Sequence, residues 1–375
     1  MAIYLDNAAT TPLHPNVKAT MIEAMDDFGN PSSIHQYGRH PHFKILSARE
    51  QIAKSIGAKT DEIVFTASGS EGDNMALVEG SHAMQQKGRH IISTAIEHPA
   101  VLNTLHRLED EGFEVTYLPV NERGEVSVED VQQALRDDTI LVSIMYGNNE
   151  VGSIMPIQRI GALLSQHQAL FHTDAVQAYG TEPIDVTTLG VDLLSVAAHK
   201  INGPKGIGFL YLRQGTPFQP LITGGEQENH RRAGTENLPA IMGFKEAVAI
   251  ISDEEKHARH QRYMTFKHEI IQQLTDAGIE VEVNGSLEGL PHILNLWFKG
   301  WRSDILLTRL DMSGIAVSSG SACTAGNVAP SHVLESMYGQ EHPRVMESLR
   351  ISFGYQTTEE DIQTLITTLI QIMKG

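Results

Sequence analysis

Seven short apolar runs, separated by stretches with helical periodicity, dominate the first two thirds of the chain. The runs are residues 62–66, 90–94, 114–118, 139–145, 170–174, 193–197 and 208–212. Most are apolar throughout instead of alternating with polar residues, which is typical of strands covered by helices on both faces. Helix-like stretches such as residues 73–86 and 128–135 lie between them. This rhythm predicts an α/β domain with a mostly parallel, seven-stranded sheet.

The last third of the chain follows a different pattern. A charged, helix-prone stretch at residues 253–274 precedes predicted strands at 279–283, 292–297 and 348–353 and a closing helix at 358–373. Strands and helices in this order favour a smaller α+β domain. We therefore predict a large domain of residues 15–257 and a small domain formed by residues 1–14 and 258–375.

Composition fits a globular protein and argues against some partners. Of 375 residues, 41% are hydrophobic and 20% are charged, which is ordinary for a chain of about two domains. The formal net charge of −18 disfavours direct binding to nucleic acid or to an anionic membrane. The first residues show no signal-peptide pattern, and no apolar run approaches the ~20 residues of a spanning helix. We expect a cytoplasmic protein.

Cys323 is the only cysteine of the chain, so no internal disulfide explains its presence. It lies within residues 318–327, a run of small and polar side chains, which predicts a mobile, solvent-exposed loop. Two interpretations stay open for this residue alone: a thiol packed as a small hydrophobic side chain, and a reactive thiol.

Polar segments follow five of the predicted strands, at the sheet edge where ligands usually bind in parallel α/β folds. In residues 65–74, free backbone N–H groups at a helix start would hold a phosphate, although a plain capped turn explains the same pattern. His98 follows the next strand and either stacks on an aromatic cofactor or simply begins a helix. The amides of residues 148 and 149 either donate to a ligand oxygen or occupy turn positions.

The last two of these segments carry an acid and a lysine. Asp174 ends an apolar strand, where a carboxylate needs a partner such as a protonated ring nitrogen. Lys200 follows another strand beside His199; it either forms a Schiff base or is an ordinary surface lysine. Together, the five segments meet the requirements of pyridoxal 5'-phosphate, which needs a phosphate anchor, an acid at its ring nitrogen and a lysine for its aldehyde.

The chain resembles the cysteine desulfurases, a group within the class V aminotransferases of fold-type I, along nearly its whole length. Four segments carry the resemblance: residues 4–11, 29–35, 231–237 and the Cys323 segment. The long SSGSACT loop resembles the subgroup that donates sulfur to scaffold proteins. The resemblance implies conversion of L-cysteine to L-alanine, with the sulfur transferred to Cys323 as a persulfide.

The resemblance also implies which residues hold the cofactor. Lys200 would bind it covalently, Asp174 would pair with its ring nitrogen, and Gln177 would contact its ring hydroxyl. His98 would stack on the ring and take part in proton transfer. The remaining cofactor contacts would come from Gly69, Ser70, Asn149, His199 and Thr235.

Substrate and partners follow from the same resemblance. Asn149 and Arg350 would hold the substrate carboxylate, since a guanidinium matches a carboxylate with two parallel hydrogen bonds. Thr235 would reach the cofactor phosphate of the neighbouring subunit in a homodimer. The persulfide would pass to an acceptor protein, such as an iron–sulfur scaffold or a thiolation enzyme.

Two positions depart from the family pattern. Ala197 stands where relatives usually carry a serine whose hydroxyl contacts the phosphate, so we expect slightly weaker cofactor retention. Residues 227–230 depart from the commoner glycine-containing version.

Three other functions compete with this interpretation. The first is another enzyme of the same cofactor class, such as an aminotransferase or a selenocysteine-specific lyase, the second is a non-catalytic partner-binding protein, and the third is a zinc protein. The presence of both Lys200 and Cys323 disfavours a non-catalytic protein. The scattered histidines and the single cysteine disfavour a zinc protein.

Overall fold

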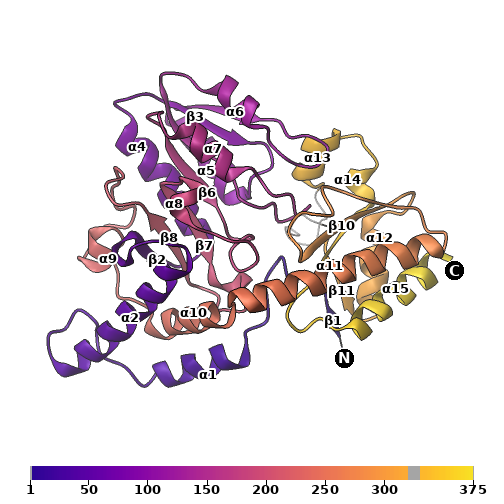
Figure 1. Cartoon of the computed structure of the whole chain (residues 1–375), viewed down its shortest axis with the longest axis horizontal. Coiled ribbons are helices and arrows are strands. Elements are labelled where there is room, and N and C mark those ends of the chain that lie inside the picture. Colours follow the sequence, from indigo (N-terminus) through magenta and orange to yellow (C-terminus); the bar gives the residue numbers. More distant parts are fainter. Residues whose placement is uncertain (1, 320–329, 375) are drawn as a thin grey trace.

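A computed structural model describes residues 2–319 and 330–374. Its largest element is a seven-stranded sheet with the order β2-β8-β7-β6-β5-β3-β4 (Figure 1). Neighbouring strands are parallel except around β8, which is antiparallel to both β2 and β7. The strands are β2 Ile63–Thr66, β3 His90–Thr94, β4 Glu114–Leu118, β5 Thr139–Ser143, β6 Leu170–Asp174, β7 Leu193–Ala197 and β8 Gly208–Leu212. The predicted mostly parallel sheet is confirmed.

Helices cover both faces of this sheet, which explains why its strands are apolar throughout. Successive residues of one strand point to opposite faces. Thus Leu141 packs into one core cluster and Val142 into the other. One face packs on α2, α7 and α10, and the other on α4 and α5. The helices of this part are α1 Pro15–Ala24, α2 Gln36–Ser55, α3 Gly69–Asn74, α4 Gly80–Met84, α5 Pro99–Asp110, α6 Val128–Ala134, α7 Ile157–Leu164, α8 Val186–Leu189, α9 Gln227–His230 and α10 Leu238–Ile250.

The long helix α11 (Asp253–Asp276) leads from this part to a second hydrophobic core (Figure 1). The serine before it, Ser252, accepts a hydrogen bond from Glu255 N, and three acidic residues occupy its first turn. Both features stabilise a helix N-terminus. The predicted division at residue 257 falls inside α11 and stays a prediction.

The second core is built on a three-stranded antiparallel sheet with the order β12-β10-β9. The chain's N-terminal strand β1 pairs in parallel with β11, and Leu5 is fully buried in this core. The remaining elements are β1 Ile3–Tyr4, β9 Val281–Val283, β10 Ile293–Phe298, β11 Ile315–Ala316, β12 Ser348–Ser352, α12 Ser303–Met312, α13 His332–Tyr338, α14 Arg344–Glu347 and α15 Glu359–Lys374. Within residues 2–319 and 330–374, no helix is both long and apolar enough to cross a membrane.

Candidate active site

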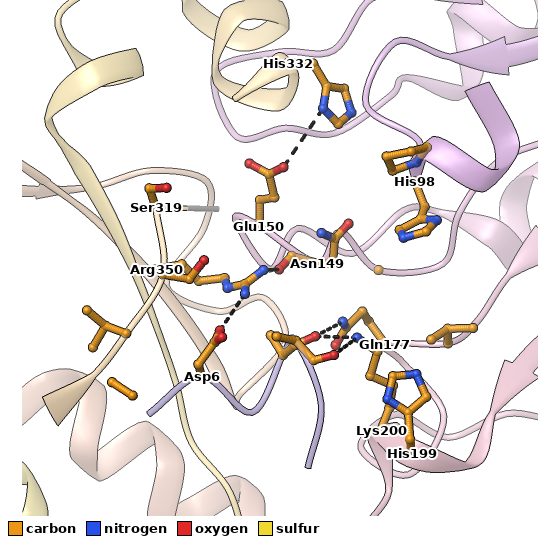
Figure 2. Close-up of a pocket in the computed structure, with 18 of the residues that line it drawn as sticks. Asp6, His98, Asn149, Glu150, Gln177, His199, Lys200, Ser319, His332 and Arg350 are labelled. Carbon is orange, nitrogen blue, oxygen red and sulfur yellow. Dashed lines mark hydrogen bonds and ion pairs between the residues drawn. The ribbon is translucent and has the colours of Figure 1, made fainter. Parts of the chain in front are cut away.

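A cavity of about 1240 Å³ lies where the carboxyl ends of the parallel strands face the second core (Figure 2). Because each strand end opens into a polar turn, residues far apart in sequence meet on its walls. Nine of the predicted site residues line it: Gly69, Ser70, His98, Asn149, Asp174, Gln177, His199, Lys200 and Arg350. Thr235 is exposed and is not among the lining residues, and Cys323 lies outside the described residues.

Lys200 ends a short turn directly after β7 and points its ammonium group at the N-terminal segment. Its Nζ donates hydrogen bonds to the carbonyls of Ala8 and Ala9. Burial, assisted by the positive charge of Arg350, lowers the pKa of Lys200 to about 8, although Asp174 and Asp6 oppose the shift. Near neutral pH a larger fraction of this amine than of an ordinary lysine is therefore uncharged and nucleophilic, as an aldehyde-binding lysine requires.

Asp174 ends β6 and is buried beside the cavity. Its Oδ1 accepts a hydrogen bond from Val176 N at 2.9 Å. Burial raises the pKa of Asp174, and the neighbouring His98 and Lys200 only partly counteract this. A buried carboxyl that faces a cavity in this way is suited to a cationic ligand group, which would favour its ionised form.

His98 is fixed at the start of α5. Its Nδ1 accepts a hydrogen bond from Ala100 N at 3.1 Å, so in the neutral ring the proton resides on Nε2. Burial lowers the pKa of His98, which Asp174 counteracts. The residue therefore presents a neutral imidazole at the cavity wall, where it can accept or donate a proton.

Arg350 and Asn149 form the wall opposite the sheet. Arg350 lies on β12, is only 3% exposed, and donates from Nη1 to Asn149 O at 2.8 Å and from Nη2 to Asp6 Oδ1 at 2.7 Å. These contacts fix the plane of the guanidinium group beside the cavity (Figure 2). A guanidinium held in this manner is a natural site for a substrate carboxylate.

Two further side chains complete the floor. Gln177 donates from Nε2 to Ala8 O at 2.9 Å. His199 Nδ1 lies 3.1 Å from the Thr10 hydroxyl, and burial together with Lys200 lowers the pKa of His199 to about 4. Both residues are thus tied to the N-terminal segment.

Among the lining residues that were not predicted as site residues are three polar ones, Glu150, His332 and Asp6. Glu150 is buried, accepts a hydrogen bond from the Ser331 hydroxyl, and lies 4.0 Å from His332 Nδ1 (Figure 2). Burial raises the pKa of Glu150, while Ser331 and His332 counteract this. Asp6 holds Arg350, as described above. Glu150 lies in one of the five polar segments and Asp6 in the segment 4–11 that carries the family resemblance, whereas His332 had no local sequence signal.

The chain is similar to known proteins over nearly its whole length. Residues 3–365 match the aminotransferase class-V family. The IscS 1 protein of Bacillus subtilis (strain 168) is 53% identical over 374 residues, which cover 99% of this chain and 98% of the relative. The protein named cysteine desulfurase IscS from Dictyoglomus turgidum is 44% identical over 375 residues, covering 99% of this chain and 94% of the relative.

Solved structures agree as well. A structure described as a NifS-like protein matches with a TM-score of 0.93 and 35% identity, covering 100% of both chains. A structure described as SspA in complex with cysteine matches with a TM-score of 0.83 and 36% identity, covering 94% of this chain and 98% of the other. The chain therefore belongs to the aminotransferase class-V family, whose members depend on pyridoxal phosphate.

Proposed function

We propose that this chain is a pyridoxal-phosphate-dependent cysteine desulfurase, which converts L-cysteine to L-alanine and keeps the sulfur on Cys323 as a persulfide. The observation that carries the proposal is the convergence of Lys200, Asp174 and Arg350 on one cavity. Relatives named cysteine desulfurase match nearly the whole chain, and a solved relative is described as a complex with cysteine.

The residues present fit the cofactor. The walls offer a partly neutral lysine, a buried acid and, at Gly69 and Ser70, the first N–H groups of a helical run. An ideal Cβ on Gly69 would lie 2.7 Å from Val176 Cγ2, so a larger residue there would disturb this wall. When bound, pyridoxal phosphate supplies an electron sink that weakens bonds at the substrate's α-carbon and beyond.

The residues of this chain would have the following roles in binding the cofactor and the substrate. Lys200 would hold the cofactor covalently, Asp174 would accept a hydrogen bond from its ring nitrogen, and His98 would stack on the ring. The phosphate is held at Gly69, Ser70 and His199, while Gln177 and Asn149 contact the ring substituents. Arg350 and Asn149 then orient the carboxylate of L-cysteine, which fixes the position of its sulfur.

Proton and sulfur transfer follow from these positions. With the cofactor bound, the Lys200 amine or His98 would take the substrate's α-proton. The thiolate of Cys323 attacks the substrate sulfur, a new sulfur–sulfur bond forms, and the carbon–sulfur bond breaks. Its electron pair stays with the three-carbon fragment, which takes up protons and leaves as alanine.

Ala197→Ser should strengthen cofactor retention. Ala197 is buried on the cavity wall, and an ideal Cβ on Gly69 would lie 3.5 Å from Ala197 Cβ. A serine hydroxyl here would add a charge-assisted hydrogen bond to the phosphate, so we expect the cofactor to dissociate roughly tenfold more slowly. Loss of cofactor absorbance in the presence of a trapping agent measures the rate. Ala197→Val, which adds bulk without a hydroxyl, is the control; equal rates for A197S and wild type would contradict the prediction.

A second copy of the chain is the proposed partner for an apolar face on α1, α2 and the loop between them. Most exposed large apolar side chains lie in residues 13–46, and Phe28 and Ile34 are 81% and 91% exposed. Patches of this kind usually mark an interface. In this homodimer, the exposed Thr235 reaches the cofactor phosphate of the neighbouring subunit.

The persulfide is then donated to an acceptor protein, such as an iron–sulfur scaffold or a thiolation enzyme. A cytoplasmic location is part of the same proposal. The names of the relatives support the sulfur-transfer role, since several are named IscS.

One incubation tests the function. The purified protein, loaded with pyridoxal phosphate, is mixed with L-cysteine. Alanine is then assayed, and the mass of the peptide that contains Cys323 is measured by mass spectrometry. We expect alanine in proportion to sulfur transferred and a peptide heavier by one sulfur atom. Consumption of an added keto acid without release of sulfur would instead establish an aminotransferase.

A further inference from the structure

A second, small cavity lies behind the floor of the active site. Its volume is about 40 Å³, and its walls include Lys200, Gln177, His292, Asn7 and Gly354. Two of these residues carry a buried acceptor or donor atom without a hydrogen-bond partner in the described part of the chain: Asn7 Oδ1 and His292 Nδ1. Unpartnered buried polar atoms are rare, and two on the wall of one cavity call for a common explanation.

Hydrogen bonding fixes the protonation of His292. Gln177 Nε2 donates to the Ala8 carbonyl, which can only accept, so the amide's oxygen is the atom that faces His292. The distance from His292 Nε2 to Gln177 Oε1 is 3.2 Å. Because that oxygen also only accepts, Nε2 must carry the ring proton.

The ring of His292 is neutral, so its Nδ1 holds a lone pair. Burial lowers the pKa of His292 to about 3, and the cations that surround it, Lys267, Lys200 and Arg350, act in the same direction. Nδ1 is therefore an acceptor that needs a donor from within the cavity.

Asn7 presents the same requirement from the other side. Its Nδ2 donates to Ser352 O at 2.9 Å and to Tyr4 O at 3.3 Å, which leaves Oδ1 as an acceptor. Gly354 packs directly against this oxygen, since an ideal Cβ there would lie 2.3 Å from Asn7 Oδ1. A cavity of about 40 Å³ has room for one water molecule, and water carries two O–H donors.

We propose that one buried water donates to both His292 Nδ1 and Asn7 Oδ1, and that His292 is a positioning residue which fixes the amide of Gln177 for the cofactor. The inference rests on the proposed function. With Oε1 held by His292 and one N–H held by Ala8 O, the second N–H of Gln177 is directed to the ring hydroxyl of pyridoxal phosphate.

The consequence is spectroscopic. A donor at the ring oxygen stabilises negative charge there, so the oxygen competes less for the proton of the cofactor–lysine bond. In His292→Leu, Gln177 Oε1 loses its donor and the amide is no longer held in one orientation. We expect the pH midpoint of the bound cofactor's visible absorption change to rise by about one unit.

The matched variant is His292→Gln, whose Nε2 can reach the position of the histidine Nε2 and donate to Gln177. Full-length, cofactor-loaded wild type and both variants are titrated by absorbance. An upward shift in H292L with little or none in H292Q supports the proposal. An unshifted midpoint in H292L, or an equal shift in both variants, overturns it, because a merely structural role would not separate the two.

Two further measurements keep the proposal falsifiable. If H292L does not fold, His292→Met, which also lacks a donor, replaces it in the same titration. Separately, a high-resolution crystal structure of the wild type should show a water within hydrogen-bond distance of His292 Nδ1 and Asn7 Oδ1, and an empty cavity overturns the water bridge. Absence of any cofactor absorbance in the loaded wild type would instead contradict the proposed function.

Discussion

Replacing Lys200 by alanine should lower the turnover of L-cysteine at least about a thousandfold, because in the proposed function this residue provides both the covalent hold on the cofactor and a base for the α-proton. The structure gives the amine its reactivity. Burial near Arg350 lowers its pKa to about 8, and the Ala8 and Ala9 carbonyls orient it. Alanine production from L-cysteine by the cofactor-loaded variant is the measurement.

Lys205 is the matched control for this substitution. It lies five residues further along the same loop, is exposed, and does not line the cavity. Lys205→Ala should therefore keep turnover close to that of the wild type. The assignment of Lys200 would be wrong if K200A retained a tenth or more of the activity, or if K205A lost as much as K200A.

The sheet and the strand-end residues were predictable because their signals are local. Each strand is a short apolar run, and each ends in a polar turn. Once a parallel sheet is inferred, Asp174 and Lys200 must lie at the same edge, since β6 and β7 are adjacent and parallel. The predicted helix at residues 73–86 begins earlier, at Gly69. The Ser68 hydroxyl caps its N-terminus by accepting a hydrogen bond from Glu71 N.

Contacts across the chain were not predictable from such signals. Asp6 and Arg350 form an ion pair over a separation of 344 residues. Only the tertiary packing of the segment after β1 beside β12, where Asp6 bridges to Ser352, brings them together. Neither the carbonyls of Ala8 and Ala9 nor the donor role of His292 has a sequence signature, because backbone groups and buried imidazoles acquire their partners through tertiary packing.

The unusual segment at residues 227–230 has a structural explanation of the same kind. Glu228, Asn229 and His230 have positive φ angles of 52°, 54° and 64°, a backbone region that favours glycine. The buried carboxylate of Glu228 accepts two hydrogen bonds of 2.6 Å from Arg49 and one of 2.8 Å from Phe65 N. These contacts hold the strained backbone, so residues with side chains occupy a backbone region that favours glycine.

Replacing Cys323 by serine should abolish sulfur release from L-cysteine while leaving binding of the amino acid intact. In the proposed function, carboxylate binding and proton removal depend on Arg350, Lys200 and His98, and the substitution leaves these three residues unchanged. A serine hydroxyl is a far weaker nucleophile than a thiolate toward sulfur, so we expect a loss of at least about a thousandfold. Sulfide released in the presence of a reductant, together with the absorbance change on adding L-cysteine, measures the two steps separately.

The position of the thiol along the chain makes this test decisive. Ser319 lines the cavity, and four residues of chain span at most about 14 Å, so a thiol at residue 323 has the reach to meet a sulfur held near Arg350. Ser321→Ala, which changes the same segment without removing the thiol, should keep sulfur release near the wild-type rate. Undiminished sulfide release from C323S would show that sulfur leaves the substrate without attack by Cys323. That result would contradict the proposed persulfide on this chain.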